Sequence, residues 1–117
     1  MYDHVGLKVK DLEASVRFYT GTLNALGYVL CSRDASGAGF GPPGEPALWL
    51  SPGKGTEAHL AFRAPDRTAV DRFHAKGLEG GGRDNGRPGL REAYGPRYYA
   101  AFLLDPDGNN VEAVFLG

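Results

Sequence analysis

The 117-residue sequence has almost no cysteine, and Cys31 is the single one. An internal disulfide and a zinc site built on paired cysteines are therefore excluded. No apolar run approaches the length of a membrane span, and the start of the sequence shows no signal-peptide pattern, so we expect a cytoplasmic protein that does not bind membranes. The formal net charge of −1 gives no reason to expect a nucleic-acid partner.

Glycine and proline are plentiful by contrast, with 18 and 8 residues. They indicate many tight turns between short strands. The length fits one domain, which we place at residues 1–117.

The chain repeats itself. Residues 4–19 align without a gap on residues 59–74, so that His4 falls on His59 and Asp11 on Asp66. Further identical pairs are Ala14 and Ala69, Arg17 and Arg72, and Phe18 and Phe73. This self-similarity predicts two duplicated units, at about residues 1–53 and about 54–117.

Each unit begins with a run of alternating polar and apolar residues, which is typical of a strand, and continues with a helical pattern. Asp11 and Asp66 stand where a helix N-cap belongs. We predict helices from about Leu12 to Leu26 and from about Arg67 to Lys76, the second ending at Gly77. Further strands are predicted at Tyr28–Arg33, Ala38–Phe40, Ala47–Ser51, Gly81–Asp84 (weakly), Tyr98–Leu104 and Asn110–Phe115. The fold class is therefore α+β, with two paired βαβββ units.

Three side chains are candidates for ligands of one divalent metal ion. His4 and His59 lie on the polar faces of equivalent strands, which pairing of the units would turn toward one cleft. On the last strand, Glu112 alternates with the apolar Val111 and Ala113, so it faces away from the packed side. Two imidazoles and a carboxylate form an open site suited to Fe, Mn, Zn or Ni.

A fourth ligand is not expected. Aligning residues 105–112 on residues 41–48 places Leu48 where Glu112 stands in the other unit, and places Trp49 opposite Ala113. Leucine does not bind metals, so we predict a three-ligand site.

The repeat, the two histidines and the segment Tyr98–Glu112 resemble the vicinal oxygen chelate superfamily, over essentially the whole chain. That superfamily includes glyoxalase I, fosfomycin-resistance enzymes, bleomycin-resistance proteins and extradiol dioxygenases. The resemblance implies eight strands in a curved cup with the helices outside, often completed in a homodimer. It also implies a metal that chelates adjacent oxygens of a small-molecule substrate and acts as a Lewis acid. The site can lie within one chain or be shared by two.

Departures from the family pattern leave the substrate and the reaction open. Leu48 at the fourth position argues against the glyoxalase I mechanism, which uses a second glutamate. Bleomycin-resistance proteins lack the metal ligands that are present here. We therefore predict a glyoxalase-like metalloenzyme with lyase, isomerase or dioxygenase chemistry. The alternative is a non-catalytic small-ligand-binding protein of the bleomycin-resistance type.

Other polar residues are candidates for binding the substrate. The glycine-rich segment Glu79–Arg97 is long and irregular enough to form a lid, and its arginines suit an anionic group. Tyr98 and Phe102 alternate onto the predicted cleft face, and Tyr98 is a candidate for proton transfer. The predicted substrate-binding set is Tyr98, Phe102, Arg97 and Arg91. His74 lies within the second predicted helix, and we expect a structural role for it.

Overall fold

The computed structural model describes all 117 residues and contains two successive βαβββ units. The first consists of β1 (Val5–Val9), α1 (Leu12–Ala25), β2 (Val29–Asp34), β3 (Gly37–Gly41) and β4 (Leu48–Pro52). The second consists of β5 (His59–Arg63), α2 (Arg67–Glu79), β6 (Arg83–Leu90), β7 (Tyr99–Leu104) and β8 (Asn110–Phe115). The predicted α+β fold with a duplicated βαβββ unit is confirmed.

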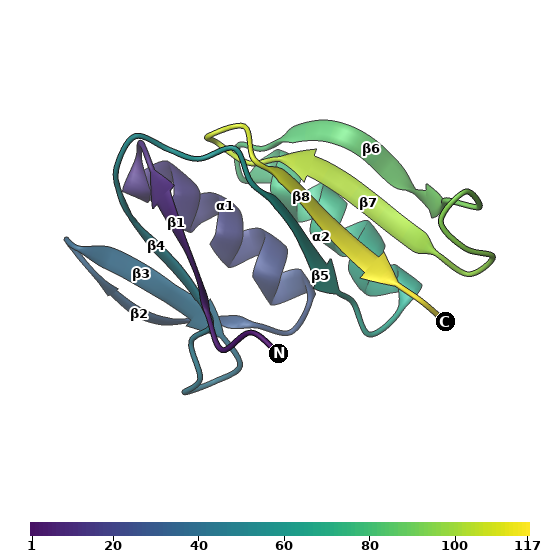
Figure 1. Ribbon diagram of the computed structural model, residues 1–117, viewed down its shortest axis with the longest axis horizontal. Helices are drawn as coiled ribbons and strands as arrows, with labels where there is room; N and C mark the ends of the chain where they lie inside the picture. The colour runs from purple at the N-terminus through teal and green to yellow at the C-terminus, as the bar shows by residue number, and fades with distance from the viewer.

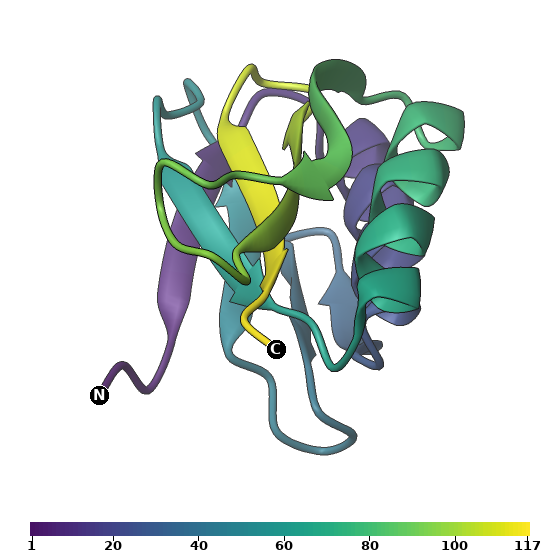
Figure 2. The same ribbon diagram turned by 90° about the vertical axis from the view of Figure 1, so that its right-hand side faces the viewer.

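The eight strands form two separate four-stranded sheets rather than one continuous sheet. Their orders are β1-β4-β3-β2 and β5-β8-β7-β6, so β1 and β5 are edge strands with equivalent places. β1 and β5 each pair in parallel with the last strand of their unit, and the remaining pairs are antiparallel. Figures 1 and 2 show that β1 and β5 run in opposite directions. The first residues of these two strands therefore lie at opposite ends.

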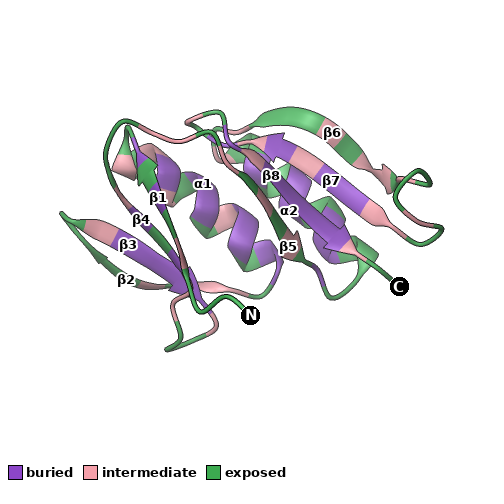
Figure 3. Cartoon of the chain, in the orientation of Figure 1, coloured by how far each residue is buried: buried purple, intermediate pink, exposed green.

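Both helices lie on the same side of the two sheets and pack against each other (Figure 2). The main core lies between the helices and the sheets, where Phe18, Tyr19 and Phe73 are fully buried. Figure 3 shows buried residues along the inner strands β3, β7 and β8, whereas β1 and β6 carry many exposed ones. No helix has the length and apolar character needed to cross a membrane.

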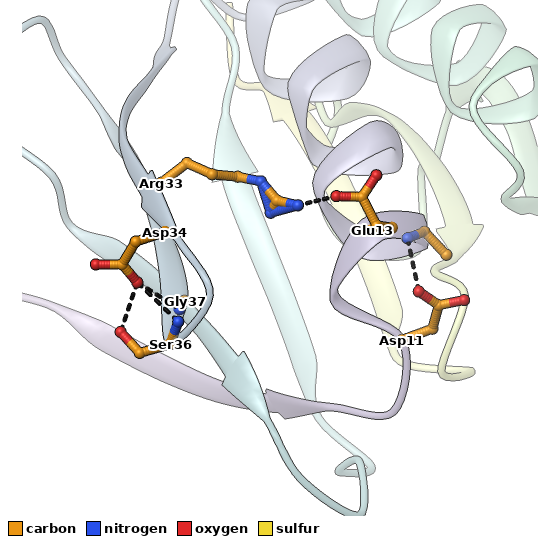
Figure 4. A network of polar contacts seen from close by, with 7 residues as sticks. Asp11, Glu13, Arg33, Asp34, Ser36 and Gly37 are labelled. Atoms are coloured by element: carbon orange, nitrogen blue, oxygen red, sulfur yellow. Dashed lines mark hydrogen bonds and ion pairs between the residues drawn. The ribbon is translucent and has the colours of Figure 1, made fainter.

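Local capping explains where the helices begin. Asp11 accepts a hydrogen bond from the backbone N–H of Ala14 at 3.1 Å, and Asp66 does the same for Ala69 at 2.7 Å. These carboxylates satisfy N–H groups that have no partner inside the helix, which confirms both predicted caps. Figure 4 shows the Asp11 cap beside the ion pair of Arg33 with Glu13, which joins β2 to α1.

The turn between β2 and β3 is held by one side chain. Asp34 accepts hydrogen bonds from the N–H groups of Ser36 at 2.8 Å and Gly37 at 3.1 Å, and from the Ser36 hydroxyl at 2.5 Å (Figure 4). Such a turn brings the two strands directly into an antiparallel pair.

Two features of the second unit differ from the predicted pattern. Gly77 does not end the helix, because α2 continues to Glu79 and Gly77 packs inside it against Leu103. The segment Glu79–Arg97 is not irregular throughout, because Arg83–Leu90 within it forms β6. Two irregularities in the β6–β7 pairing, around Gly86, accommodate its glycines and its proline.

Candidate functional site

Glu112 is a buried carboxylate on the face of the second sheet that points away from the helices. It lies in the middle of β8, level with Ala61 of β5 and Phe102 of β7. Only 3% of Glu112 is exposed, although its own strand neighbours Val111 and Ala113 already fill the core on the other face. A buried carboxylate needs donors or a cation to compensate for lost hydration, so the groups around it decide what it can do.

The first of these groups is the Tyr98 hydroxyl, which donates a hydrogen bond to Oε2 of Glu112. Burial, and then this hydrogen bond, raise the pKa of Tyr98 to about 12. The phenol therefore keeps its proton at neutral pH and remains a donor. It orients the carboxylate and leaves Oε1 free.

The second group is His59, whose Nε2 lies 3.2 Å from Oε1 of Glu112. On the other side of the ring, Nδ1 lies 3.0 Å from the backbone oxygen of Asn110. A carbonyl oxygen can only accept, so Nδ1 carries the proton and Nε2 of the neutral ring presents a lone pair. Two acceptors, Nε2 and Oε1, then face each other and require a proton or a cation between them.

His4 does not join this pair. It precedes β1, its side chain is 61% exposed, and its Nδ1 lies 2.7 Å from the carboxylate of Asp3. His59 begins β5, which runs opposite to β1 (Figure 1), so the two histidines belong to opposite ends of these strands. No group of three histidine, cysteine or acidic side chains comes within metal-binding reach in the single chain.

A cleft between the two units nevertheless includes both histidines in its lining. It has a volume of about 460 Å³ and is bounded mainly by apolar residues. On the side of the first unit these include Leu23, Phe40 and Leu48, and on the side of the second Leu60 and Phe62.

The strand register corrects the predicted equivalent of Glu112. His4 aligns with His59, so Gly6 aligns with Ala61 two residues later. Gly6 is paired with Trp49, as Ala61 is paired with Glu112. Trp49, not Leu48, therefore occupies the fourth position.

Leu48 instead faces the core. It is 5% exposed and is paired with Val5, as Val111 is paired with Leu60 in the second unit. The predicted alignment was shifted by one residue, which in a strand exchanges the two faces. The fourth ligand remains missing, because an indole does not bind a divalent metal.

Trp49 rests on a glycine in the neighbouring strand. Three carbons of its six-membered ring lie 2.7 to 2.9 Å from the point where a Cβ on Gly39 would be. The ring thus covers Gly39, its cross-strand neighbour, and only a glycine fits there. Trp49 is still 39% exposed, which is unusual for so large an apolar side chain.

Among the predicted substrate-binding residues, Phe102 and Arg91 contact each other, whereas Arg97 lies elsewhere. Phe102 is level with Glu112, and the guanidinium of Arg91 lies over its ring, 5.3 Å from the centroid. Arg91 is held there by hydrogen bonds from Nη1 to the oxygen of Gly89 and from Nη2 to that of Arg87. Arg97, in contrast, is exposed and lies beside Gly117 at the end of the chain.

His74 is buried between α2 and β6, with Nε2 2.9 Å from Asp84. This contact joins the helix to the edge strand, in agreement with a structural role.

Sequence reasoning missed the contributions of Asn110 and Trp49. Every residue has a backbone carbonyl, so the residue type of Asn110 could not reveal that its backbone oxygen faces Nδ1 of His59. Trp49 could have been found by aligning Pro43, rather than Pro42, with Pro106.

No family model matches the chain, and no curated protein matches it. Among solved structures, a glyoxalase/bleomycin resistance protein from Albidiferax ferrireducens is 31% identical, with a TM-score of 0.85 and 98% of both chains covered. A putative glyoxalase from Bacillus halodurans is 30% identical, with a TM-score of 0.75 and coverage of 98% of this chain and 95% of that one.

A third structure, a glyoxylase/bleomycin resistance protein/dioxygenase domain from Frankia, is 25% identical, with a TM-score of 0.67. The alignment covers 97% of this chain and 95% of that one. Given identity above 30% over nearly the whole of both chains, together with the duplicated βαβββ unit, this chain belongs to the glyoxalase/bleomycin resistance protein family of the vicinal oxygen chelate superfamily.

Proposed function

We propose that this chain is a glyoxalase-like metalloenzyme in which His4, His59 and Glu112 bind one divalent metal ion that chelates a small oxygenated substrate. The observation that carries the proposal is the approach of His59 Nε2 to Glu112 Oε1 at 3.2 Å, with Nδ1 of the same ring turned to the oxygen of Asn110. Metal-binding histidines commonly donate their second N–H to a backbone carbonyl in this way. The donor set suits Fe, Mn, Zn or Ni.

His4 completes the set from a second copy of the chain. Its Nδ1 is already turned to a carboxylate, which leaves Nε2 free, as in His59. Within one chain the two histidines belong to opposite ends of strands that run in opposite directions. When the first unit of one copy meets the second unit of another, His4 and Trp49 of one chain come to face His59 and Glu112 of the other. A symmetric dimer would then contain two equivalent sites.

The bound metal would supply Lewis acidity to the adjacent oxygens of the substrate. Tyr98 keeps one oxygen of Glu112 occupied and so presents the other oxygen alone. Its hydroxyl is also a proton-bearing group in contact with the site. Phe102 lines the same face of the sheet, beside Glu112.

Arg91 is suited to binding an anionic group of the substrate. It is partly buried over Phe102, it is held by two backbone oxygens, and no carboxylate pairs with it. A positive charge held in place in this way is available to a carboxylate or phosphate. Arg97, beside Gly117, is the weaker candidate.

The test is the metal content of the purified protein beside that of Glu112→Gln, which keeps the shape of the side chain and removes its charge. Glu92→Gln, at an exposed loop position, is the matched control. We expect about one metal ion per chain in the parent and in the control, and a large loss in Glu112→Gln. A parent that takes up none of Fe(II), Mn(II), Zn(II) or Ni(II) would contradict the metalloenzyme and favour the non-catalytic binding protein.

A further inference from the structure

Trp49 has a position that the proposed metal site does not explain. The register makes it the structural counterpart of Glu112, on the face of the first sheet that points away from the helices. In the dimer of the proposed function, that face lies opposite His59 and Glu112 of the other copy. A large aromatic ring thus stands where a fourth ligand would stand in a symmetric site.

The two faces of the indole differ in their surroundings. One face rests on Gly39, where three ring carbons lie 2.7 to 2.9 Å from the point that a Cβ would occupy. The residue is nevertheless 39% exposed, so part of the side chain is accessible. A ring that is supported on one face and accessible to a ligand is suited to stacking against a second flat ring.

The neighbouring groups on this face are small or cationic. Gly6, which is paired with Trp49, has no side chain to cover the ring, and nothing lies within 4 Å of the point where its Cβ would be. Lys8, two residues further along β1, donates a hydrogen bond to the Ser51 hydroxyl at 3.0 Å and has no acidic partner. Lys8 therefore favours a ligand that carries an anionic group beside its flat ring.

We infer that Trp49 is a specificity-determining residue that stacks on a flat unsaturated ring attached to the carbon that bears the metal-chelating groups of the substrate. The inference rests on the proposed function, because the metal fixes where those oxygens lie. It narrows the substrate class from any small oxygenated molecule to an aromatic one. A hydroxy acid that bears a phenyl ring has this form.

Three probes with the same hydroxyl and carboxylate test the inference. They are mandelate, which has a phenyl ring, hexahydromandelate, which has a saturated ring of similar size, and lactate, which has a methyl group. Their dissociation constants are measured by calorimetry on the Zn(II)-loaded protein. Trp49 is the single tryptophan, so its fluorescence emission also reports directly on contact with the ring.

We expect mandelate to bind at least about 10-fold more tightly than lactate, and several-fold more tightly than hexahydromandelate, because stacking adds to the burial of apolar surface. Trp49→Leu should lose the preference of mandelate over hexahydromandelate, whereas Trp49→Phe should keep most of it. Both variants should retain the metal content of the parent, because neither changes a ligand.

The failure of this inference can be told apart from failure of the proposed function. A metal-loaded parent that binds the three probes equally, or a preference that survives in Trp49→Leu, would overturn the role of Trp49 and leave the metal site intact. A parent that takes up no metal would overturn the proposed function itself.

Discussion

The hydroxyl of Tyr98 and Nε2 of His59 share one carboxylate, because Tyr98 donates to Oε2 of Glu112 while His59 faces Oε1 at 3.2 Å. The two carboxylate oxygens of Glu112 therefore have different partners. One oxygen is neutralised in part by a hydrogen bond from a neutral donor, and the other is directed at an imidazole. Glu112 is thus prepared to bind a metal through one oxygen.

This arrangement predicts the effect of Tyr98→Phe. Without the hydroxyl, the buried carboxylate can turn and lose its orientation toward His59. Because loss of a group that orients a ligand typically costs about 10- to 100-fold in metal affinity, we expect a drop of that size in competitive Zn(II) titrations. The fold should be retained, since the phenyl ring stays in place.

Tyr94→Phe is the matched control for Tyr98→Phe. The Tyr94 ring meets that of Tyr98 edge-on at 5.2 Å, but the residue is exposed and its hydroxyl makes no hydrogen bond within the chain. The metal affinity of the Tyr94→Phe variant should equal that of the parent. Equal affinities in all three proteins would mean that Tyr98 does not orient Glu112.

A second prediction concerns the origin of His4. If each site takes His4 from one chain and Glu112 from the other, His4→Ala and Glu112→Ala homodimers each lose a ligand at both sites. A heterodimer of the two variants has one site with both defects and one with neither. We expect purified heterodimers, isolated through two different tags, to regain about one metal ion per dimer.

The same experiment has a clear opposite outcome. A site built within one chain would be defective in both halves of the heterodimer, and no metal would be regained. Asp3→Asn is the control for disturbance of the N-terminal segment, because Asp3 is exposed and contacts His4. We expect this variant to lose less metal than His4→Ala.

The sequence allowed prediction of those features that depend on local chemistry or on the repeat. Asp11 and Asp66 are capping residues because their own side chains reach the first helical turn. Burial of Val111 and Ala113 opposite Glu112 followed from simple alternation along one strand. These features require no knowledge of how distant segments meet.

Features that depend on distant contacts were missed. The fourth position was assigned to Leu48 because aligning Pro42 instead of Pro43 with Pro106 shifts the strand by one residue. Gly77 looked like a helix end, since its packing against Leu103 is visible only in three dimensions. The separation of the strands into two sheets depends on how the units dock, which neither unit's sequence pattern encodes.

The close packing at Gly77 predicts a loss of stability in Gly77→Ala. A Cβ there would lie 2.2 Å from Cδ1 of Leu103, which is fully buried, and 3.1 Å from Cγ2 of Thr22. Overpacking of this kind costs about 1–3 kcal/mol, which exceeds the gain of up to about 1 kcal/mol in helix propensity. The free energy of unfolding, measured with urea, should therefore fall.

Gly21→Ala in α1 is the matched control for Gly77→Ala. Its Cβ would meet only Lys76, at the ordinary contact distances of 3.6 and 3.7 Å. The helix-propensity gain then prevails, and we expect stabilisation by about 0.5–1 kcal/mol. If both alanine variants gained stability, α2 would not pack as closely on β7 as described.

The last prediction concerns the buried pair of Tyr19 and Asp105, which joins α1 to the end of β7. The Tyr19 hydroxyl donates a hydrogen bond to Oδ2 of Asp105 at 2.5 Å, and both residues are almost fully buried. Removing a hydrogen bond to a charged group costs about 1.5–3 kcal/mol, so Tyr19→Phe should destabilise the fold by that amount at about pH 7. Metal binding should be unaffected, because the pair is not part of the site.

The cost of Tyr19→Phe should also depend on pH. Burial first, and then the charges of Asp105 and Asp107, raise the pKa of Tyr19 well above its ordinary value of 10.0. The unfolded chain releases this proton near pH 10 while the folded chain still holds it, so the free energy of unfolding falls as the pH rises further. The contribution of Tyr19 is complete below about pH 10 and is lost above it.

Tyr98 and Tyr99 also have raised pKa values, but both are present in parent and variant, so their effects cancel in the difference. The difference between parent and Tyr19→Phe in urea unfolding should thus shrink as pH rises above about 10. A difference that stays constant there would mean that Tyr19 ionises alike in the folded and unfolded chains.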